Sequence, residues 1–256
     1  MSENLFDLSG EVAVVIGATG ALGGACALAM AKAGARVAVA GRNAERGEAR
    51  VQEIADAGGQ AQFFACDAMD PASLKSCHEA VGQALGAPTV LLNAAGGNHP
   101  DAIVTPELPF EKIPLPAWAS VFDLNLVGGL LLPCQEFGPA MCGRGRGSII
   151  NIGSRMADDP TQGGGVLYST SKAAVHMFSF CLADEVREYN VAVNVLSPGS
   201  LRTEGSAAIP WTQRDWHERV EPSEVGPSAV YLAKQDAQSL TGQLVLRAEF
   251  GKTWGM

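Results

Sequence analysis

Short apolar runs alternate with longer amphipathic stretches along the whole chain. Each run is rich in valine, leucine, isoleucine and alanine, and a helical pattern separates it from the next. Seven such runs occur, at residues 12–16, 36–40, 61–65, 89–93, 147–152, 191–196 and 242–247. Short strands that read as continuous apolar runs are typical of a parallel sheet covered on both faces.

This alternation predicts an α/β fold, a doubly wound sheet of seven parallel strands of the Rossmann type. No linker, repeat or low-complexity tract interrupts it, so we expect one domain over residues 1–256. A proline-containing stretch at about 200–222 is expected to be a loop beside a substrate. Pro133 falls inside a helical stretch, residues 117–141, and should kink or interrupt that helix.

Composition and charge narrow the classes of partner. The chain has 27 acidic and 18 basic residues, for a net charge of −9. Nucleic acids and anionic membranes require a basic surface, so neither partner is expected. The longest near-apolar run, at about 124–133, is too short to span a bilayer, and the first ten residues do not resemble a signal peptide.

The cysteines and histidines form no redox or metal-binding motif. The six cysteines are scattered without a C-x-x-C pair, and the four histidines lack metal-ligand spacing. Buried free thiols in a reducing compartment are the simplest interpretation. We therefore expect a cytoplasmic protein without a metal site.

The most glycine-rich turn lies between the first predicted strand and the first predicted helix. "VVIGATGALGGA" places Gly17, Gly20 and Gly23 there, with Thr19, Ala21 and Leu22 between them. Backbone amides at the start of a helix bind phosphate groups, and glycines let a pyrophosphate approach closely. The alternative is a tight strand–helix turn that binds nothing. The flanking strand and helix favour a dinucleotide site.

The second strand bears on the choice of dinucleotide. An NAD-specific site carries an acidic residue about 20 positions after the glycine turn, where this chain has Gly41 and Arg42. A guanidinium suits the additional phosphate of NADP, so NADP is favoured and NAD is the alternative. Arg42 could instead begin a solvated helix. Asp67 follows the third strand and is expected near the adenine, or else at a helix N-cap.

The segment "YSTSK" supplies a candidate acid–base pair. Tyr168 and Lys172 are four residues apart, which places them on one face of a helix. A nearby ammonium stabilises a phenolate and lowers the tyrosine pKa towards the working range of a proton donor. The spacing alone is weak evidence, because it also occurs in exposed helices.

Neighbouring motifs strengthen the assignment, because they fall at the carboxyl ends of predicted strands, where ligands bind in open α/β sheets. The residues concerned are Asn93, Ala94 and Gly96 after the fourth strand, Ser154 after the fifth, and Pro198, Gly199 and Thr203 after the sixth, together with Asn125 in the helix between the fourth and fifth.

With these motifs in this order, the chain resembles the single-domain members of the short-chain dehydrogenase/reductase family over nearly its whole length. The resemblance implies a catalytic tetrad of Asn125, Ser154, Tyr168 and Lys172. Tyr168 would exchange the proton, Ser154 would orient the carbonyl oxygen, and Lys172 would lower the tyrosine pKa and hold the nicotinamide ribose. Asn125 would hold a water in a proton relay.

The resemblance also implies cofactor contacts from Asn93, Ala94, Gly96 and Thr203. Two of the departures from the usual pattern bear on the site and on the subunit contacts. Ala21 stands where a glycine is expected, and the C-terminal segment, residues 248–256, lacks the usual "DGG". The second change leaves the subunit contacts there undefined.

The loop "GGNHP" is polar where substrates bind. Asn98 and His99 both form hydrogen bonds, which suits a hydroxyl-rich or carboxylate-bearing substrate. The loop resembles that of D-mannonate oxidoreductases (fructuronate reductases) in the same family, and Arg155 would then meet a carboxylate. The alternatives are a simple turn at Asn98–His99 and a surface position for Arg155.

Together these features predict an NAD(P)-dependent oxidoreductase that interconverts a carbonyl and a secondary alcohol, preferably on a sugar acid or polyol. A 3-ketoacyl or small-ketone reductase is the alternative, and a cofactor-binding regulator without turnover is a third. Family resemblance indicates a homotetramer or homodimer. Trp211 and Trp216 are candidates for a lid or a subunit contact.

Overall fold

The computed structural model describes residues 6–159 and 165–255, without the side chains of residues 100, 210 and 211. Its central feature is one parallel sheet with the strand order β3-β2-β1-β4-β5-β6-β7. Among these residues the strands are β1 (Val12–Ile16), β2 (Arg36–Gly41), β3 (Gln60–Ala65), β4 (Val90–Asn93), β5 (Gly147–Ile152), β6 (Val191–Ser197) and β7 (Leu244–Leu246). The predicted doubly wound α/β fold is confirmed.

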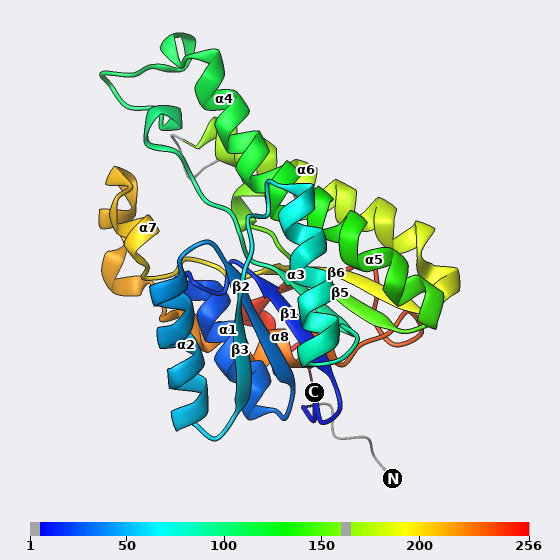
Figure 1. Ribbon diagram of the computed structural model, residues 1–256. Coiled ribbons are helices and arrows are strands. Elements are labelled where there is room, and N and C mark those ends of the chain that lie inside the picture. Colours follow the sequence, from blue (N-terminus) through cyan, green and yellow to red (C-terminus); the bar gives the residue numbers. More distant parts are fainter. Residues whose placement is uncertain (1–5, 160–164, 256) are drawn as a thin grey trace.

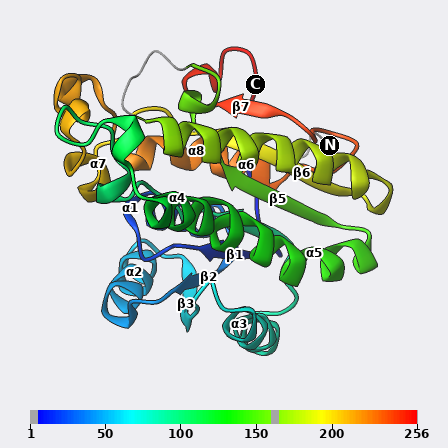
Figure 2. The same cartoon turned by 90° about the horizontal axis from the view of Figure 1, so that it is seen from above.

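Helices cover both faces of the sheet (Figures 1 and 2). The longer helical elements are α1 (Ala21–Lys32), α2 (Ala44–Asp56), α3 (Pro71–Ala84), α4 (Leu115–Phe122), η3 (Asp123–Leu131), α5 (Leu132–Arg144), α6 (Val166–Glu185) and α8 (Gly226–Ala233). One apolar core joins the sheet to α1, α2 and α8, and a second joins it to α3, α5 and α6. The two cores explain why the strands read as unbroken apolar runs.

The topology creates a crevice at the centre of the sheet. β1 pairs with β2 on one side and with β4 on the other. The chain therefore turns outwards in opposite directions at the carboxyl ends of β1 and β4, which is where ligands bind in sheets of this type. The glycine turn after β1 and the loop after β4 line the two sides of this crevice.

The helix predicted around residues 117–141 is longer and less regular than expected. α4, η3 and α5 form one continuous helical segment, whose middle part, η3, is a π-helix. Pro133 lies in the first turn of α5 and lacks the N–H that would bond the preceding turn. The predicted interruption therefore takes the form of a widened π turn. In Figure 2 this segment runs beside α6.

By length and composition alone, the segment Leu115–Arg144 would also fit a membrane span. In the fold, however, it packs on the sheet, and its residues Leu130, Cys134, Phe137 and Met141 belong to the second core. Its apolar composition is thus used, at least in part, for packing against the sheet.

The unusual C-terminal segment has a structural role. Trp254 donates its indole N–H to the carbonyl of Leu246, at the end of β7, over 3.0 Å. The Trp254 ring packs on Tyr231 of α8 and on Phe250, and Phe6 joins the same group from the start of the chain. This aromatic cluster ties the end of the chain to α8.

Candidate active site

A cavity of about 550 Å³ occupies the crevice at the carboxyl ends of the strands. It runs from the glycine turn, past the ends of β4, β5 and β6, to the segment around α7 (Glu204–Ala207). Figure 1 shows α7 and the start of α4 rising beyond the sheet at this end. Of the predicted site residues, the cavity is lined by Gly17, Gly20, Ala21, Leu22, Gly23, Ala94, Gly96, Asn98, Ser154, Arg155, Tyr168, Lys172, Pro198, Gly199 and Thr203.

The glycine turn fits tightly against its neighbours. Gly17 has φ +84°, and a Cβ there would lie 2.7 Å from the backbone nitrogen of Ala95. A Cβ on Gly23 would lie 2.4 Å from the carbonyl oxygen of Gly17. The first glycine therefore allows β1 and β4 to approach, and the last allows α1 to start directly on the turn.

The N-terminus of α1 suits an anionic group. Its N-cap is Gly20, which forms no side-chain cap, and no acidic residue occurs in the first turn. The first N–H groups of a helix have no partner within the helix and carry a partial positive charge. Because these groups open onto the cavity, Ala21, Leu22 and Gly23 fit the pyrophosphate of a dinucleotide.

Ser154, Tyr168 and Lys172 converge at the wall of this cavity. Tyr168 and Lys172 project from α6, and Ser154 follows β5. The Ser154 side chain interacts with the Tyr168 phenol and acts to lower its pKa. The Lys172 Nζ lies 5.8 Å from the centroid of the Tyr168 ring and donates to the carbonyl of Ile152 over 2.7 Å. Two hydroxyls and one ammonium thus share one small region.

The position of Ser154 is set by its own turn. The short helix η4 (Arg155–Ala157) begins directly after it, and Ser154 is its N-cap. Its Oγ accepts a hydrogen bond from the backbone N–H of Met156 over 3.2 Å, and its carbonyl accepts one from Ala157 over 3.1 Å. Because Oγ accepts the N–H of Met156, the hydroxyl hydrogen of Ser154 points away from Met156, towards Tyr168 or a ligand.

Burial perturbs both groups on α6. It lowers the pKa of Lys172 from 10.5 to about 8, because the charged form is poorly solvated. Burial also raises the pKa of Tyr168, and the hydrogen bond from Ser154 opposes this effect. The lowering of the Tyr168 pKa by the Lys172 ammonium stays a prediction. The larger influence on the phenol is its removal from water.

Asn125 lies beneath the cavity wall in the π-helix. Its side-chain oxygen accepts the N–H of Gly97 over 2.9 Å, and its amide donates to the Gly97 carbonyl over 2.8 Å. A Cβ on Gly96 would lie 2.7 Å from the Asn125 oxygen and 3.5 Å from the Lys172 Nζ. Asn125 thus fixes the loop after β4 directly beside Lys172.

Several predicted cofactor residues do not line the cavity. Arg42 is exposed at the end of β2, while Arg46, on the first turn of α2, does line the cavity. Asn93 is buried and donates to Asn151 within the sheet over 2.9 Å. The carboxylate of Asp67 accepts the N–H of Met69.

Thr19 is also absent from the cavity lining. Its side chain occupies the space above Gly41, where a Cβ would lie 2.7 Å from the Thr19 Oγ1. Thr19 therefore supports the glycine turn against the end of β2. The residues that can contact a ligand begin at Gly20.

The two residues of the polar loop are separated by the fold. Asn98 and Arg155 line the cavity, but His99 does not. The His99 Nδ1 accepts the N–H of Asp101 over 3.3 Å, and its ring is directed into the local turn. The turn interpretation of this loop therefore describes His99, and the substrate interpretation is compatible only with Asn98.

The residues on the far wall of the cavity carry no recognisable sequence motif. Ser206, Ile209, Thr212 and Arg219 line the cavity from the segment after β6. Arg219 is 10% exposed and pairs with Asp215 over 3.0 Å. Trp216 is half-buried and absent from the cavity lining, and the side chain of Trp211 lies outside the described residues.

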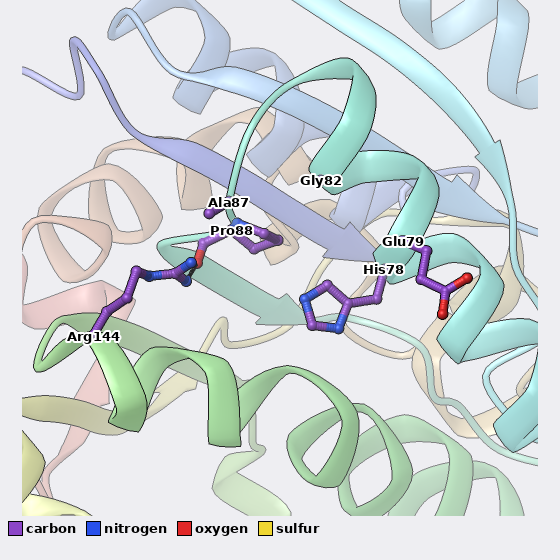
Figure 3. A pocket seen from close by; sticks show the side chains of 6 residues that line it. All are labelled: His78, Glu79, Gly82, Ala87, Pro88 and Arg144. Carbon is purple, nitrogen blue, oxygen red and sulfur yellow. Dashed lines mark hydrogen bonds between the residues drawn. The ribbon is translucent and has the colours of Figure 1, made fainter.

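A second, smaller hollow lies at the opposite end of the sheet (Figure 3). It is lined by His78, Glu79, Gly82, Ala87, Pro88 and Arg144. Arg144 donates to the carbonyl of Pro88 over 2.5 Å, and the His78 Nδ1 lies 2.8 Å from Glu136. Arg144 and His78 therefore already have partners, and the remaining charged residue of the hollow, Glu79, is exposed.

Comparison with known proteins agrees with this geometry. Residues 11–213 match the family model of short chain dehydrogenases. The uncharacterized oxidoreductase UxuB of Bacillus subtilis is 35% identical over 205 residues, which are 77% of this chain and 73% of the relative. D-threitol dehydrogenase of Mycolicibacterium smegmatis is 34% identical over 245 residues, which are 93% of this chain and 91% of the relative.

Solved structures show the same fold. A gluconate 5-dehydrogenase from Burkholderia cenocepacia, in complex with NADP and tartrate, superposes with a TM-score of 0.81 at 25% identity, and the match covers 94% of each chain. The family match spans most of the chain and includes the glycine turn, Ser154, Tyr168 and Lys172. The chain belongs to the short-chain dehydrogenase family.

Proposed function

We propose that the protein is an NAD(P)-dependent dehydrogenase that interconverts a carbonyl and a secondary alcohol, with Asn125, Ser154, Tyr168 and Lys172 as its working residues. One observation carries the proposal. The hydroxyl-bearing residues Ser154 and Tyr168 line the same cavity as the uncapped N-terminus of α1. A proton donor and an anion-binding helix end thus share one cavity.

A nicotinamide, when bound, would supply or accept the hydride at the reacting carbon. In reduction, Ser154 donates a hydrogen bond to the substrate oxygen and orients it, and Tyr168 transfers its proton to that oxygen. The raised pKa of Tyr168 keeps the phenol protonated at neutral pH, as a general acid requires. In oxidation, Tyr168 accepts the alcohol proton.

Lys172 and Asn125 support this proton transfer. Lys172 has a pKa of about 8, so it is charged at pH 7, and its ammonium stabilises the phenolate that Tyr168 becomes. Asn125 holds the loop after β4 beside Lys172 through its paired hydrogen bonds to Gly97. Residues on this loop, Ala94 and Gly96, line the cavity on the side of the dinucleotide.

NADP is the preferred cofactor in this proposal, with NAD as the alternative. Arg46 lines the cavity on the side of β2, where the adenosine ribose of a dinucleotide would lie, and Arg42 is four residues away. The Arg46 guanidinium at this position favours a 2′-phosphate, with Arg42 as a more distant positive charge. A structurally similar gluconate 5-dehydrogenase is described in complex with NADP.

The proposed substrate is a polyol, keto-sugar or sugar acid. Asn98 and Arg155 give the substrate side of the cavity hydrogen-bonding and cationic groups, and Ser206 and Thr212 add hydroxyls. Named relatives act on D-threitol and on gluconate, which are of this class. A D-mannonate or fructuronate type of substrate is the finer proposal. The segment at about 200–222 would close the substrate side.

We also propose a homotetrameric, cytoplasmic protein, with a homodimer as the alternative. Leu115 on α4 is 78% exposed and Met177 on α6 is 62% exposed, and both helices lie on one face of the molecule (Figure 2). Exposed apolar side chains of this kind favour a subunit contact. All six cysteines are free, which suits a reducing compartment.

The test is a turnover assay that follows nicotinamide absorbance with NADPH and with NADH. The carbonyl panel contains fructuronate, 5-ketogluconate, simple ketoses and an acetoacetyl thioester. Turnover of a keto-sugar acid or ketose supports the proposal and identifies the cofactor. Activity confined to the thioester would keep the reaction class and overturn the substrate class.

A further inference from the structure

His176 is a buried imidazole that the proposed chemistry does not use. It lies on α6, one turn after Lys172 and two turns after Tyr168, so the three side chains follow one face of the helix. Its side chain is only 6% exposed. The Nε2 atom lies 3.3 Å from the backbone nitrogen of Ser154 and accepts its hydrogen bond. A ring nitrogen that accepts a hydrogen bond carries no proton.

The opposite ring nitrogen faces a carboxylate. The Nδ1 atom of His176 lies 3.6 Å from Oδ1 of Asp158, which follows η4. Because Nε2 accepts a hydrogen bond, the single ring proton of the neutral imidazole belongs on Nδ1. A carboxylate on that side favours this tautomer. The fold thus brings His176 close to both Ser154 and Asp158.

The absence of a side chain at Gly153 leaves room for the His176 ring. A Cβ on Gly153 would lie 2.4 Å from the His176 Nε2 and 2.4 Å from Cγ1 of Val195. The imidazole therefore occupies space that any larger residue at position 153 would take. Apart from its interaction with Tyr168, the other bonds of Ser154 fall within its own turn, to Met156 and Ala157. His176 links that turn to α6.

We propose that His176, with Asp158, is a positioning residue for this reaction. Its neutral imidazole fastens the backbone of Ser154 to the helix that carries Tyr168, and so sets the spacing of the two hydroxyls that meet the substrate oxygen. The inference rests on the proposed function. A misplacement of about 1 Å in such a constellation costs up to ~10²-fold in rate.

Protonation of His176 removes this link, because an imidazolium cannot accept a hydrogen bond. Burial lowers the His176 pKa below 6.5, the Asp158 carboxylate opposes this, and the Lys172 ammonium adds to it. Other charged groups on the neighbouring elements, Arg155 on η4 and Asp123 on η3, are exposed to solvent. The reductive rate should therefore fall only at pH values below the usual histidine range.

A matched pair of variants tests the proposal. His176→Gln keeps an acceptor near the place of Nε2, whereas His176→Met has a similar length and no acceptor. We expect His176→Met to lower kcat by about 10- to 100-fold with NADPH affinity unchanged, and His176→Gln to stay within a few-fold of the wild type. The fall of kcat at low pH, which we expect in the wild type, should be absent in His176→Gln. Equal loss in both variants, or a fall at low pH that persists in His176→Gln, overturns the proposal.

A spectroscopic measurement separates this inference from the proposed function. The chain has four histidines, so ¹⁵N-histidine labelling gives a simple spectrum, and His176→Gln identifies the signal of His176. We expect the Nδ1–H tautomer, with an unprotonated Nε2, at neutral pH in the full-length protein. The opposite tautomer overturns the positioning role even if the enzyme is active. The expected tautomer in a protein without turnover would overturn the proposed function alone.

Discussion

The Arg46 guanidinium and the Glu204 carboxylate meet at the edge of the cavity, with 3.2 Å between Nη2 and Oε2. Arg46 comes from the first turn of α2, on the cofactor side, and Glu204 begins α7, on the substrate side. The two side chains are 59% and 85% exposed. A pair this exposed contributes only about 0.2–1 kcal/mol, so a phosphate group can displace the carboxylate.

This pair predicts how cofactor preference changes. Arg46→Ala should weaken NADPH about tenfold more than NADH, because a 2′-phosphate would lose a cationic partner. Glu204→Gln should have the opposite effect and lower the KM for NADPH by a few-fold, since no carboxylate then competes. Paired KM measurements for both nucleotides test this. Arg42→Ala is the control for general loss of positive charge, and a larger effect there than at Arg46 would contradict the structure.

Tyr168→Phe should separate binding from chemistry. The phenyl ring keeps the packing on α6 but removes the hydroxyl that meets Ser154. We expect kcat to fall by about 10²- to 10⁴-fold, the usual contribution of a general acid, with little change in NADPH binding. Turnover and fluorescence titration of NADPH are the measurements. Activity near that of the wild type would remove Tyr168 from its proposed role.

The pH dependence of stability follows from Lys172. Its pKa is about 8 in the folded protein, against the ordinary lysine value of 10.5, so the unfolded chain binds more protons between these values. Stability should therefore rise with pH across this window, and the charged lysine should cost roughly 3 kcal/mol below it. Urea unfolding of the wild type and of Lys172→Met at several pH values tests this. Lys172→Met should be more stable than the wild type at pH 7, and its stability should increase much less with pH.

The pH dependence of activity should differ between directions. Because burial raises the Tyr168 pKa, the phenolate that oxidation requires forms only at alkaline pH. We expect alcohol oxidation to accelerate with rising pH, while carbonyl reduction stays high at neutral pH, where the phenol is protonated. Initial rates in both directions across pH are the measurement. An oxidation rate that is already maximal at pH 6 would contradict the direction of this pKa change.

Glycine substitutions should show where close packing is required. Gly23→Ala places a Cβ 2.4 Å from the Gly17 carbonyl, so it should destabilise the fold and weaken cofactor binding. Gly82→Ala is the matched control, because it lies within α3 and no atom lies within 4 Å of its Cβ. That change should stabilise the protein by about 0.5–1 kcal/mol. Thermal unfolding with and without NADPH compares the two.

The substrate loop gives a direct contrast between neighbours. Asn98→Ala should raise the KM for a polar carbonyl substrate by about tenfold, because a cavity-lining hydrogen bond is lost. His99→Ala should leave the KM nearly unchanged, since its ring serves the local turn. Steady-state kinetics of both variants on the same substrate test this. A larger effect at His99 would mean that the loop rearranges on binding.

Much of the fold was predictable because its signals are local. Alternating apolar runs and helical patterns placed the seven strands, and the glycine turn identified the helix start that suits an anion. Ser154, Tyr168 and Lys172 were found because their spacing and their place after strands are properties of the chain itself. The π-helix before Pro133 was expected only as an interruption, since the form of a widened turn depends on what packs against it.

The sequence by itself determined the order of strands and helices, the anion-binding turn and the candidate acid–base residues, because periodicity and turn chemistry act over a few neighbouring residues. Only the tertiary structure decided that Arg46 reaches the cavity and Arg42 does not, and that Asn98 faces it while His99 does not. It also brought His176 against Ser154. These relations depend on how elements far apart in the chain pack together, and side chains one turn apart can then face different surroundings.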